Sequence, residues 1–87
     1  MNISYHKNFL KSYRKRILPN SSLDGKFKER LKLFIEDKSN SILKDHNLKG
    51  NKSKYRAFSI TGDIRVVYEQ VGSGILLHDV GTHNQVY

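Results

Sequence analysis

The stretch that decides the fold is residues 55–83, YRAFSITGDIRVVYEQVGSGILLHDVGTH. In its first part, YRAFSIT, residues alternate with a period of two, which places Phe58 and Ile60 on one face of a strand. The segments TGD and GSG are turn signals, and Gly62 is free to take a positive φ. The runs that follow them are rich in β-branched and apolar residues. The stretch therefore predicts three successive strands on short turns, an antiparallel meander.

The residues before this meander have helical spacing. Residues 2–5 read as a short strand, 6–18 as a helix that Pro19 stops, and 21–37 as a second helix with Ser21 or Ser22 as its N-cap. We expect both apolar helix faces to pack in the core. These faces comprise Phe9, Leu10, Tyr13 and Ile17 in the first helix, and Leu23, Phe27, Leu31, Phe34 and Ile35 in the second.

The predicted order is thus β-α-α-β-β-β in a single domain over residues 1–87. The fold class is α+β, an antiparallel-rich sheet with two N-terminal helices packed on one face. If Phe58 and Ile60 point to the helices, Tyr55, Ala57 and Ser59 point to the opposite face. We expect that face to be open and able to receive a nucleic-acid strand.

Charge is the most informative feature of the composition. Sixteen Lys and Arg residues against eight Asp and Glu give a formal net charge of +8. Such an imbalance favours a polyanionic partner, either nucleic acid or an acidic protein, although a basic surface without a specific partner has the same composition. The basic residues lie in the front and middle of the chain, and none follows Arg65.

The composition also sets the expected compartment. The chain has no cysteine, and hence neither a disulfide framework nor a thiolate metal site. No apolar run approaches the roughly 18 residues of a membrane helix. The first residues lack the apolar segment of a signal peptide. We therefore expect a cytoplasmic protein that has no membrane partner.

Four residues in the second half of the chain suit phosphodiester cleavage. Attack by the 2′-hydroxyl of RNA needs a base, an acid for the leaving oxygen, and a cation that stabilises the developing charge. Two histidines, a carboxylate and an arginine meet these needs without a metal. They are His46, Asp63, Arg65 and His83.

Each of these residues also has an ordinary structural interpretation. His46 can be an exposed loop histidine and Asp63 a turn residue. Arg65 can be an ion-pair partner of Glu69 or Asp79, and His83 an incidental polar residue. His78 lies on the opposite strand parity to His83 and is interpreted as scaffold. No pair of histidines has the spacing of a zinc motif, so we predict no metal site and no cofactor.

The segments LKDHNLKG, YRAFSITGDIRVVY and LLHDVGTHNQVY together resemble the second half of the RelE/ParE toxin superfamily. They are most similar to its YafQ-like branch of messenger-RNA interferases. The resemblance covers residues 43–87 in motif detail and the β-α-α start in pattern only. It implies a RelE-like microbial RNase fold and a toxin of a type II toxin–antitoxin system. Such a toxin cleaves mRNA on the ribosome without a metal and is held inactive by an antitoxin.

The resemblance also assigns roles to residues. The histidine of the DHxLxG motif falls on His46, the aspartate before the next strand on Asp63, and the histidine of GTH on His83. The aromatic residue of the family tail falls on Tyr87. Arg65 matches an arginine of RelE-type members that stabilises the scissile phosphate. RNA-binding roles are expected for the basic residues Lys49, Lys52, Lys54 and Arg56.

One position departs from the YafQ pattern. Where that branch has a further histidine on the strand before the turn, this chain has Ser59. Because a serine is neither an acid nor a base near neutral pH, Arg65 and the basic loop would have to compensate, or cleavage would be slower. The alternative function is that of ParE-like relatives, which inhibit a protein target such as gyrase and are not nucleases. The expected partners are a cognate antitoxin, mRNA and the ribosome with its rRNA.

Overall fold

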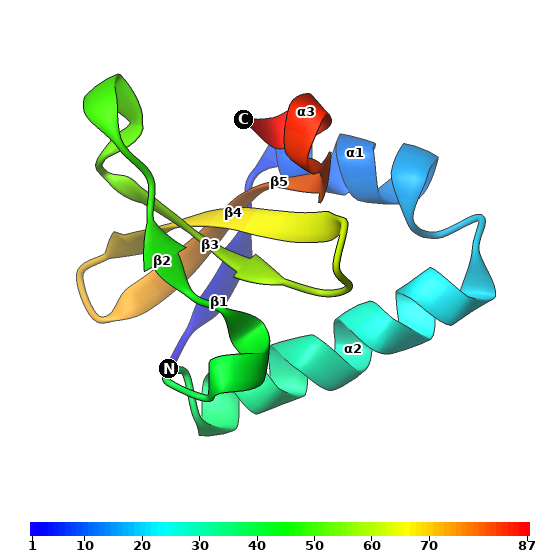
Figure 1. Ribbon diagram of the computed structural model, residues 1–87, viewed down its shortest axis with the longest axis horizontal. Helices are drawn as coiled ribbons and strands as arrows, with labels where there is room; N and C mark the ends of the chain where they lie inside the picture. Colours follow the sequence, from blue (N-terminus) through cyan, green and yellow to red (C-terminus); the bar gives the residue numbers. More distant parts are fainter.

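The predicted meander forms the centre of a five-stranded sheet in the computed structural model, which describes the whole chain (Figure 1). Its strands are β3 (Tyr55–Ser59), β4 (Ile64–Val71) and β5 (Gly74–Thr82), and neighbouring pairs are antiparallel. The first strand, β1 (Ile3–Tyr5), pairs parallel with β5, and a two-residue strand, β2 (His46–Asn47), pairs with β3. The order across the sheet is β1-β5-β4-β3-β2. The predicted α+β class is confirmed, with β2 as an addition.

The two turns of the meander use different devices. Gly72 has a φ of +59°, which the absence of a Cβ atom permits. Gly62, by contrast, does not take the positive φ that the sequence suggested. The Oγ1 atom of Thr61 accepts hydrogen bonds from the backbone N–H groups of Asp63 and Ile64, at 3.2 and 3.0 Å. A side-chain acceptor therefore closes this turn where a left-handed glycine was expected.

The helical segments before the meander are α1 (Lys7–Arg16), α2 (Ser21–Glu36) and two single-turn 3-10 helices, η1 (Ser41–Leu43) and η2 (Gly50–Lys52). The N-cap of α2 is Asn20, because its Oδ1 atom accepts the N–H groups of Ser22 and Leu23. The prediction of a serine cap was therefore wrong by one residue. Asparagine is an equally good capping residue, and its earlier position includes both serines in the helix. No helix in the chain has the length and apolar character that a membrane-spanning helix needs.

The core lies between α1, α2 and one face of the sheet. Phe34 of α2 stacks on Phe58 of β3 with ring centroids 4.5 Å apart, and both rings are fully buried. Two residues of the predicted apolar faces are instead exposed: Leu10 to 46% and Ile35 to 43%. The sheet covers only the middle of the apolar face of each helix. Apolar residues at the edge of that face, such as Leu10 and Ile35, therefore remain in contact with solvent.

The predicted strand does not reach the end of the sequence. After Thr82 the chain turns into a short helix, α3 (His83–Val86), drawn in red at the top of Figure 1. Its first turn is a capping box. The Oε1 atom of Gln85 accepts a hydrogen bond from the backbone N–H of Thr82 at 2.8 Å, and the side chain of Thr82 accepts one from the backbone N–H of Gln85. The segment THNQ carries this signature, which stops the strand at its threonine.

The helix α3 changes the face that was predicted to be open. Val86 packs against Ala57 and Val67 on the side of the sheet opposite α2 and forms a second, smaller apolar cluster. Ala57 is fully buried and Ser59 is only 7% exposed. The prediction of an uncovered face was therefore wrong at its centre, because the tail folds back over it.

Candidate active site

The two predicted catalytic histidines both contact Tyr87. His83 is the first residue of α3 and Tyr87 directly follows the helix, and their rings make an edge contact with centroids 4.5 Å apart. The Tyr87 hydroxyl lies 3.5 Å from the Nε2 atom of His46, although the two residues are 41 positions apart in the chain. The folded-back tail thus brings together His46, His83 and Tyr87 at one edge of the sheet.

Arg65 lies against the same tyrosine. Its guanidinium carbon is 6.0 Å from the centroid of the Tyr87 ring, within the range of a cation–π contact. Burial raises the pKa of the Tyr87 phenol, and the positive charge of Arg65 acts in the opposite direction. Arg65 makes no ion pair with Glu69 or Asp79, which instead bind His78 and Arg16. Its charge is therefore available to a ligand.

The basic loop before β3 is attached to the tail. The Nζ atom of Lys52 donates a hydrogen bond of 2.9 Å to the main-chain oxygen of Tyr87. Lys54 lies with its Nζ atom 5.1 Å from the ring centroid of Tyr55, and Lys49 is exposed where η2 begins. The three predicted RNA-binding lysines thus lie on one loop, and one of them holds the tail directly.

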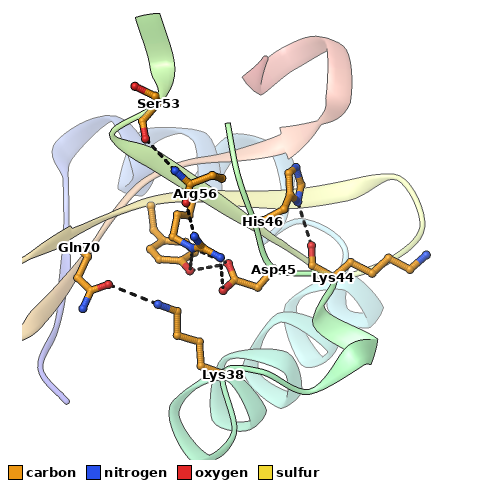
Figure 2. A network of polar contacts seen from close by, with 9 residues as sticks. Lys38, Lys44, Asp45, His46, Ser53, Arg56 and Gln70 are labelled. Carbon is orange, nitrogen blue, oxygen red and sulfur yellow. Dashed lines mark hydrogen bonds and ion pairs between the residues drawn. The ribbon is translucent and has the colours of Figure 1, made fainter. Parts of the chain in front are cut away.

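His46 is oriented by the residue two positions before it. Its Nδ1 atom lies 2.9 Å from the main-chain oxygen of Lys44 (Figure 2). Because a carbonyl oxygen only accepts, this contact places a proton on Nδ1. The Nε2 atom, which faces Tyr87, is then left to accept or to carry a second proton.

A partly buried polar network lies beside His46. The carboxylate of Asp45 accepts hydrogen bonds from Arg56, with its Nη2 atom at 3.1 Å, and from the hydroxyl of Tyr68 at 2.5 Å (Figure 2). Arg56 also donates to the side chain of Asn47. These bonds connect the residues on both sides of His46 to β3 and β4, so the network fixes the position of the edge strand.

The network has consequences for two ionisable groups. Hydrogen bonding to Asp45 raises the pKa of the Arg56 guanidinium, and burial raises the pKa of the Tyr68 phenol. Arg56 thus has an acidic partner within the protein, whereas none of the three lysines forms an ion pair. The sequence did not suggest a role for Asp45 or Tyr68. Asp45 could have been found from the sequence, because it directly precedes His46 in LKDHNLKG. Tyr68 could not, because it lies 23 positions from Asp45 and no local pattern connects the two residues.

Two predicted residues, Asp63 and Ser59, make no hydrogen bond with the histidines or Tyr87. Asp63 is an exposed turn residue, and the Nη1 atom of Arg65 is 3.4 Å from its main-chain oxygen, without any contact between its carboxylate and either histidine. Ser59 is opposite Arg65 in the β3–β4 register. It lines a polar cavity on the side of the turn.

His78 belongs to a different cluster. Its Nε2 atom is 3.0 Å from Glu69, and its ring stacks on His6 with centroids 4.9 Å apart. A β-bulge occurs here, because Val67 pairs with Asp79 and the next residue of β4 pairs with Leu77. The bulge interrupts the alternation of strand faces by which the sequence analysis separated His78 from His83. The two histidines nevertheless contact different residues.

Both the sequence and the fold of this chain match those of known bacterial toxins. The whole chain, residues 1–87, matches the family model described as bacterial toxin of type II toxin–antitoxin system, YafQ. No curated protein sequence matches. Among solved structures, the Escherichia coli DinJ–YafQ complex superimposes with a TM-score of 0.80 at 22% identity, over 99% of this chain and 97% of that one.

Two further structures have the same fold. A copper-bound mutant toxin from Helicobacter pylori has a TM-score of 0.83 and 26% identity, over 100% of this chain and 99% of its own. The YoeB–YefM complex from Staphylococcus aureus has a TM-score of 0.76 and 24% identity, over 95% and 97%. The RelE-like fold expected from the sequence is thereby confirmed.

Proposed function

The chain belongs to the YafQ family of bacterial toxins of type II toxin–antitoxin systems, and from this we propose that it is an endoribonuclease that cleaves mRNA on the ribosome. The observation that carries the proposal is the convergence of His46, His83, Arg65 and Tyr87 at one sheet edge. These side chains come from three separate parts of the sequence. They supply two proton-transfer groups, a cation and an aromatic ring.

In the proposed reaction the 2′-hydroxyl of the message attacks the adjacent phosphorus, and the bond to the 5′-oxygen breaks. One imidazole takes the proton from the hydroxyl and the other gives a proton to the leaving oxygen. His46 and His83 both contact Tyr87, and this shared contact supports the division of labour. Which of the two is the base and which the acid is left unassigned.

Arg65 and Tyr87 complete the proposed site. The guanidinium of Arg65 would stabilise the charge that develops on the non-bridging oxygens in the transition state. The half-buried ring of Tyr87 would stack on a base or orient the nucleotide. Asp63 is kept as a candidate that would contact the substrate from the adjacent turn.

Binding of RNA is proposed for the loop that holds Tyr87. Lys49, Lys52 and Lys54 would contact phosphates of mRNA or rRNA, which the net charge of +8 supports. Arg56 was predicted with them. Its ion pair with Asp45 supports a positioning role for it in addition to any contact with RNA.

We propose that this chain is inhibited by an antitoxin, as in the complexes of its relatives. A cognate antitoxin, acidic or amphipathic, would cover the basic face and the tail. The E. coli relative is in complex with DinJ and the S. aureus relative with YefM. We expect residues 1–87 to act in the cytoplasm as a single domain, and no membrane partner is proposed.

Mapping of transcript ends during expression tests the proposal. Cells that express the wild-type protein should arrest growth and accumulate cuts within coding regions, in phase with codons. His83→Gln should abolish both effects, whereas the matched control His78→Gln should retain them. Growth arrest with intact transcripts and signs of DNA damage would support the inhibitor of a protein target and refute the nuclease.

A further inference from the structure

A polar cavity is lined by Lys44, the residue whose main-chain oxygen orients His46. It has a volume of about 380 Å³ and is formed where the β3–β4 turn meets η1 and α2. It is lined by one apolar residue together with two cationic side chains, three hydroxyl groups and a glycine. The polar residues and the glycine are Arg30, Ser41, Lys44, Ser59, Thr61 and Gly62. No carboxylate lines the cavity, so it is suited to an anion.

The two cations in the cavity have no acidic partner. The ion pairs of the chain are Arg16–Asp79, Lys28–Asp24, Arg56–Asp45 and His78–Glu69. Arg30 makes only a long contact of 3.5 Å from Nη1 to the main-chain oxygen of Ile42. Most donors of its guanidinium, and all three of the Lys44 ammonium group, are therefore available to a ligand.

Lys44 connects this cavity to His46. It has a φ of 51° and a ψ of 38°, and it is the one residue other than glycine with a positive φ. Such a backbone costs a lysine about 1–2 kcal/mol. In this conformation its main-chain oxygen meets the imidazole of His46, while its side chain extends the other way (Figure 2). A single strained residue thus orients the histidine and supplies a cation to the cavity.

Ser59 connects the cavity to the other side of the candidate site. It is the partner of Arg65 in the β3–β4 register, and Arg65 lies against Tyr87. The cavity is therefore flanked by the residues that hold His46 and by those that surround Tyr87. An RNA strand whose scissile phosphate lay between the histidines would bring a neighbouring phosphate towards it.

We propose that this cavity binds a phosphate group of the RNA backbone that neighbours the scissile phosphate. The inference rests on the proposed nuclease function and adds a second anchor to it. A guanidinium, an ammonium group and hydroxyl donors are the groups that hold a phosphodiester through its non-bridging oxygens. A carboxylate of the antitoxin could use the same donors, but the position next to His46 and Arg65 favours RNA.

Binding of a short single-stranded RNA to the whole protein tests the inference. An RNA with 2′-O-methyl groups is used, since it lacks the attacking hydroxyl, and its affinity is measured over a range of salt concentrations. Arg30→Gln and Lys44→Asn should each weaken binding about three- to tenfold and flatten the salt slope by about 0.7. Asparagine is chosen at position 44 because it tolerates a positive φ. The loss of binding free energy in the double variant should be smaller than the sum of the losses in the two single variants, because both cations bind one phosphate.

Lys32→Gln is the matched control, because Lys32 is an exposed basic residue on the same helix that does not line the cavity. It corrects for the general loss of positive charge. Titration with inorganic phosphate, followed by NMR, should shift the amide signals of residues 41–44 and 59–62. The inference is overturned if both cavity variants match Lys32→Gln, or if they weaken only the antitoxin complex. A wild-type protein that does not cut mRNA refutes the nuclease separately, since RNA binding is measured without cleavage.

Discussion

Asp45 links the edge strand that carries His46 to β3 and β4. Its carboxylate is 9% exposed and accepts from both Arg56 and Tyr68. Asp45→Asn keeps the size but leaves the arginine without a countercharge. We expect the free energy of unfolding to fall by about 2 kcal/mol, as measured by urea denaturation. Cleavage should fall further than stability alone predicts, since the edge strand that carries His46 loosens.

The control for this prediction is Asp79→Asn. The ion pair between Asp79 and Arg16 spans 3.5 Å, and its side chains are 31% and 27% exposed. A pair so open to solvent contributes less than about 1 kcal/mol. Equal losses of stability in the two variants would contradict the central place given to Asp45.

At the scale of single residues, the sequence predicted the members of the proposed site better than their neighbours. His46, His83 and Tyr87 were singled out, and the structure places them together. Asp45 and Tyr68 were not, because their bond joins residues from different elements, and no local pattern encodes such a pairing. Whether the residues perform the proposed roles stays a prediction.

Among the elements, α3 decides whether the site is assembled. A four-residue helix is not stable alone, so α3 depends on its capping box and on Val86. Thr82→Ala removes one half of the box, which costs about 1 kcal/mol. We expect faster hydrogen exchange at the Tyr87 amide, which donates to the His83 oxygen at 3.0 Å, and slower cleavage.

Asn20→Ala provides the comparison for this prediction, since it removes the N-cap of α2 at the far side of the core. It should lower overall stability by a similar amount without a selective effect on α3. If Thr82→Ala left both the exchange at Tyr87 and the cleavage rate unchanged, α3 would not be the element that assembles the site.

Sequence patterns predicted α1, α2, the three strands of the meander and the short strand β1, but not β2 or α3. β4 and β5 have enough residues for a period to be recognised, and α1 and α2 begin and end within two residues of their predicted bounds. β2 has two residues and α3 has four, so neither contains a full period. The capping box in THNQ was the available signal for α3, and strand propensity before it masked that signal.

For the molecule as a whole, buried phenols make stability sensitive to alkaline pH. Burial and a bond to Asp45 raise the pKa of Tyr68 well above its usual value of about 10. Above that pH the unfolded chain loses a proton that the folded state keeps. The stability should thus be fully present below about pH 10 and fall by up to about 1.4 kcal/mol per pH unit above it. Tyr68→Phe should show a shallower fall, and an identical pH dependence would contradict this account.

The covered face of the sheet could not be predicted from the sequence, because it depends on the folded arrangement of the whole chain. The charge of +8 was visible in the composition, but the covered face was not. Covering it requires the tail to fold over Ala57 and Val67, a contact between residues about 20 to 30 positions apart. Whether a face is open is a property of the assembled chain.

The central claim is that His46 and His83 act on the same bond. Its most direct test is the single-turnover rate of mRNA cleavage on purified ribosomes by His46→Gln, His83→Gln and the double variant. Each single substitution should slow cleavage about 100-fold or more, and the double variant should be little slower than the slower single one, as expected for groups that act as a unit. Wild-type rates in either single variant, with both proteins folded, would contradict the claim.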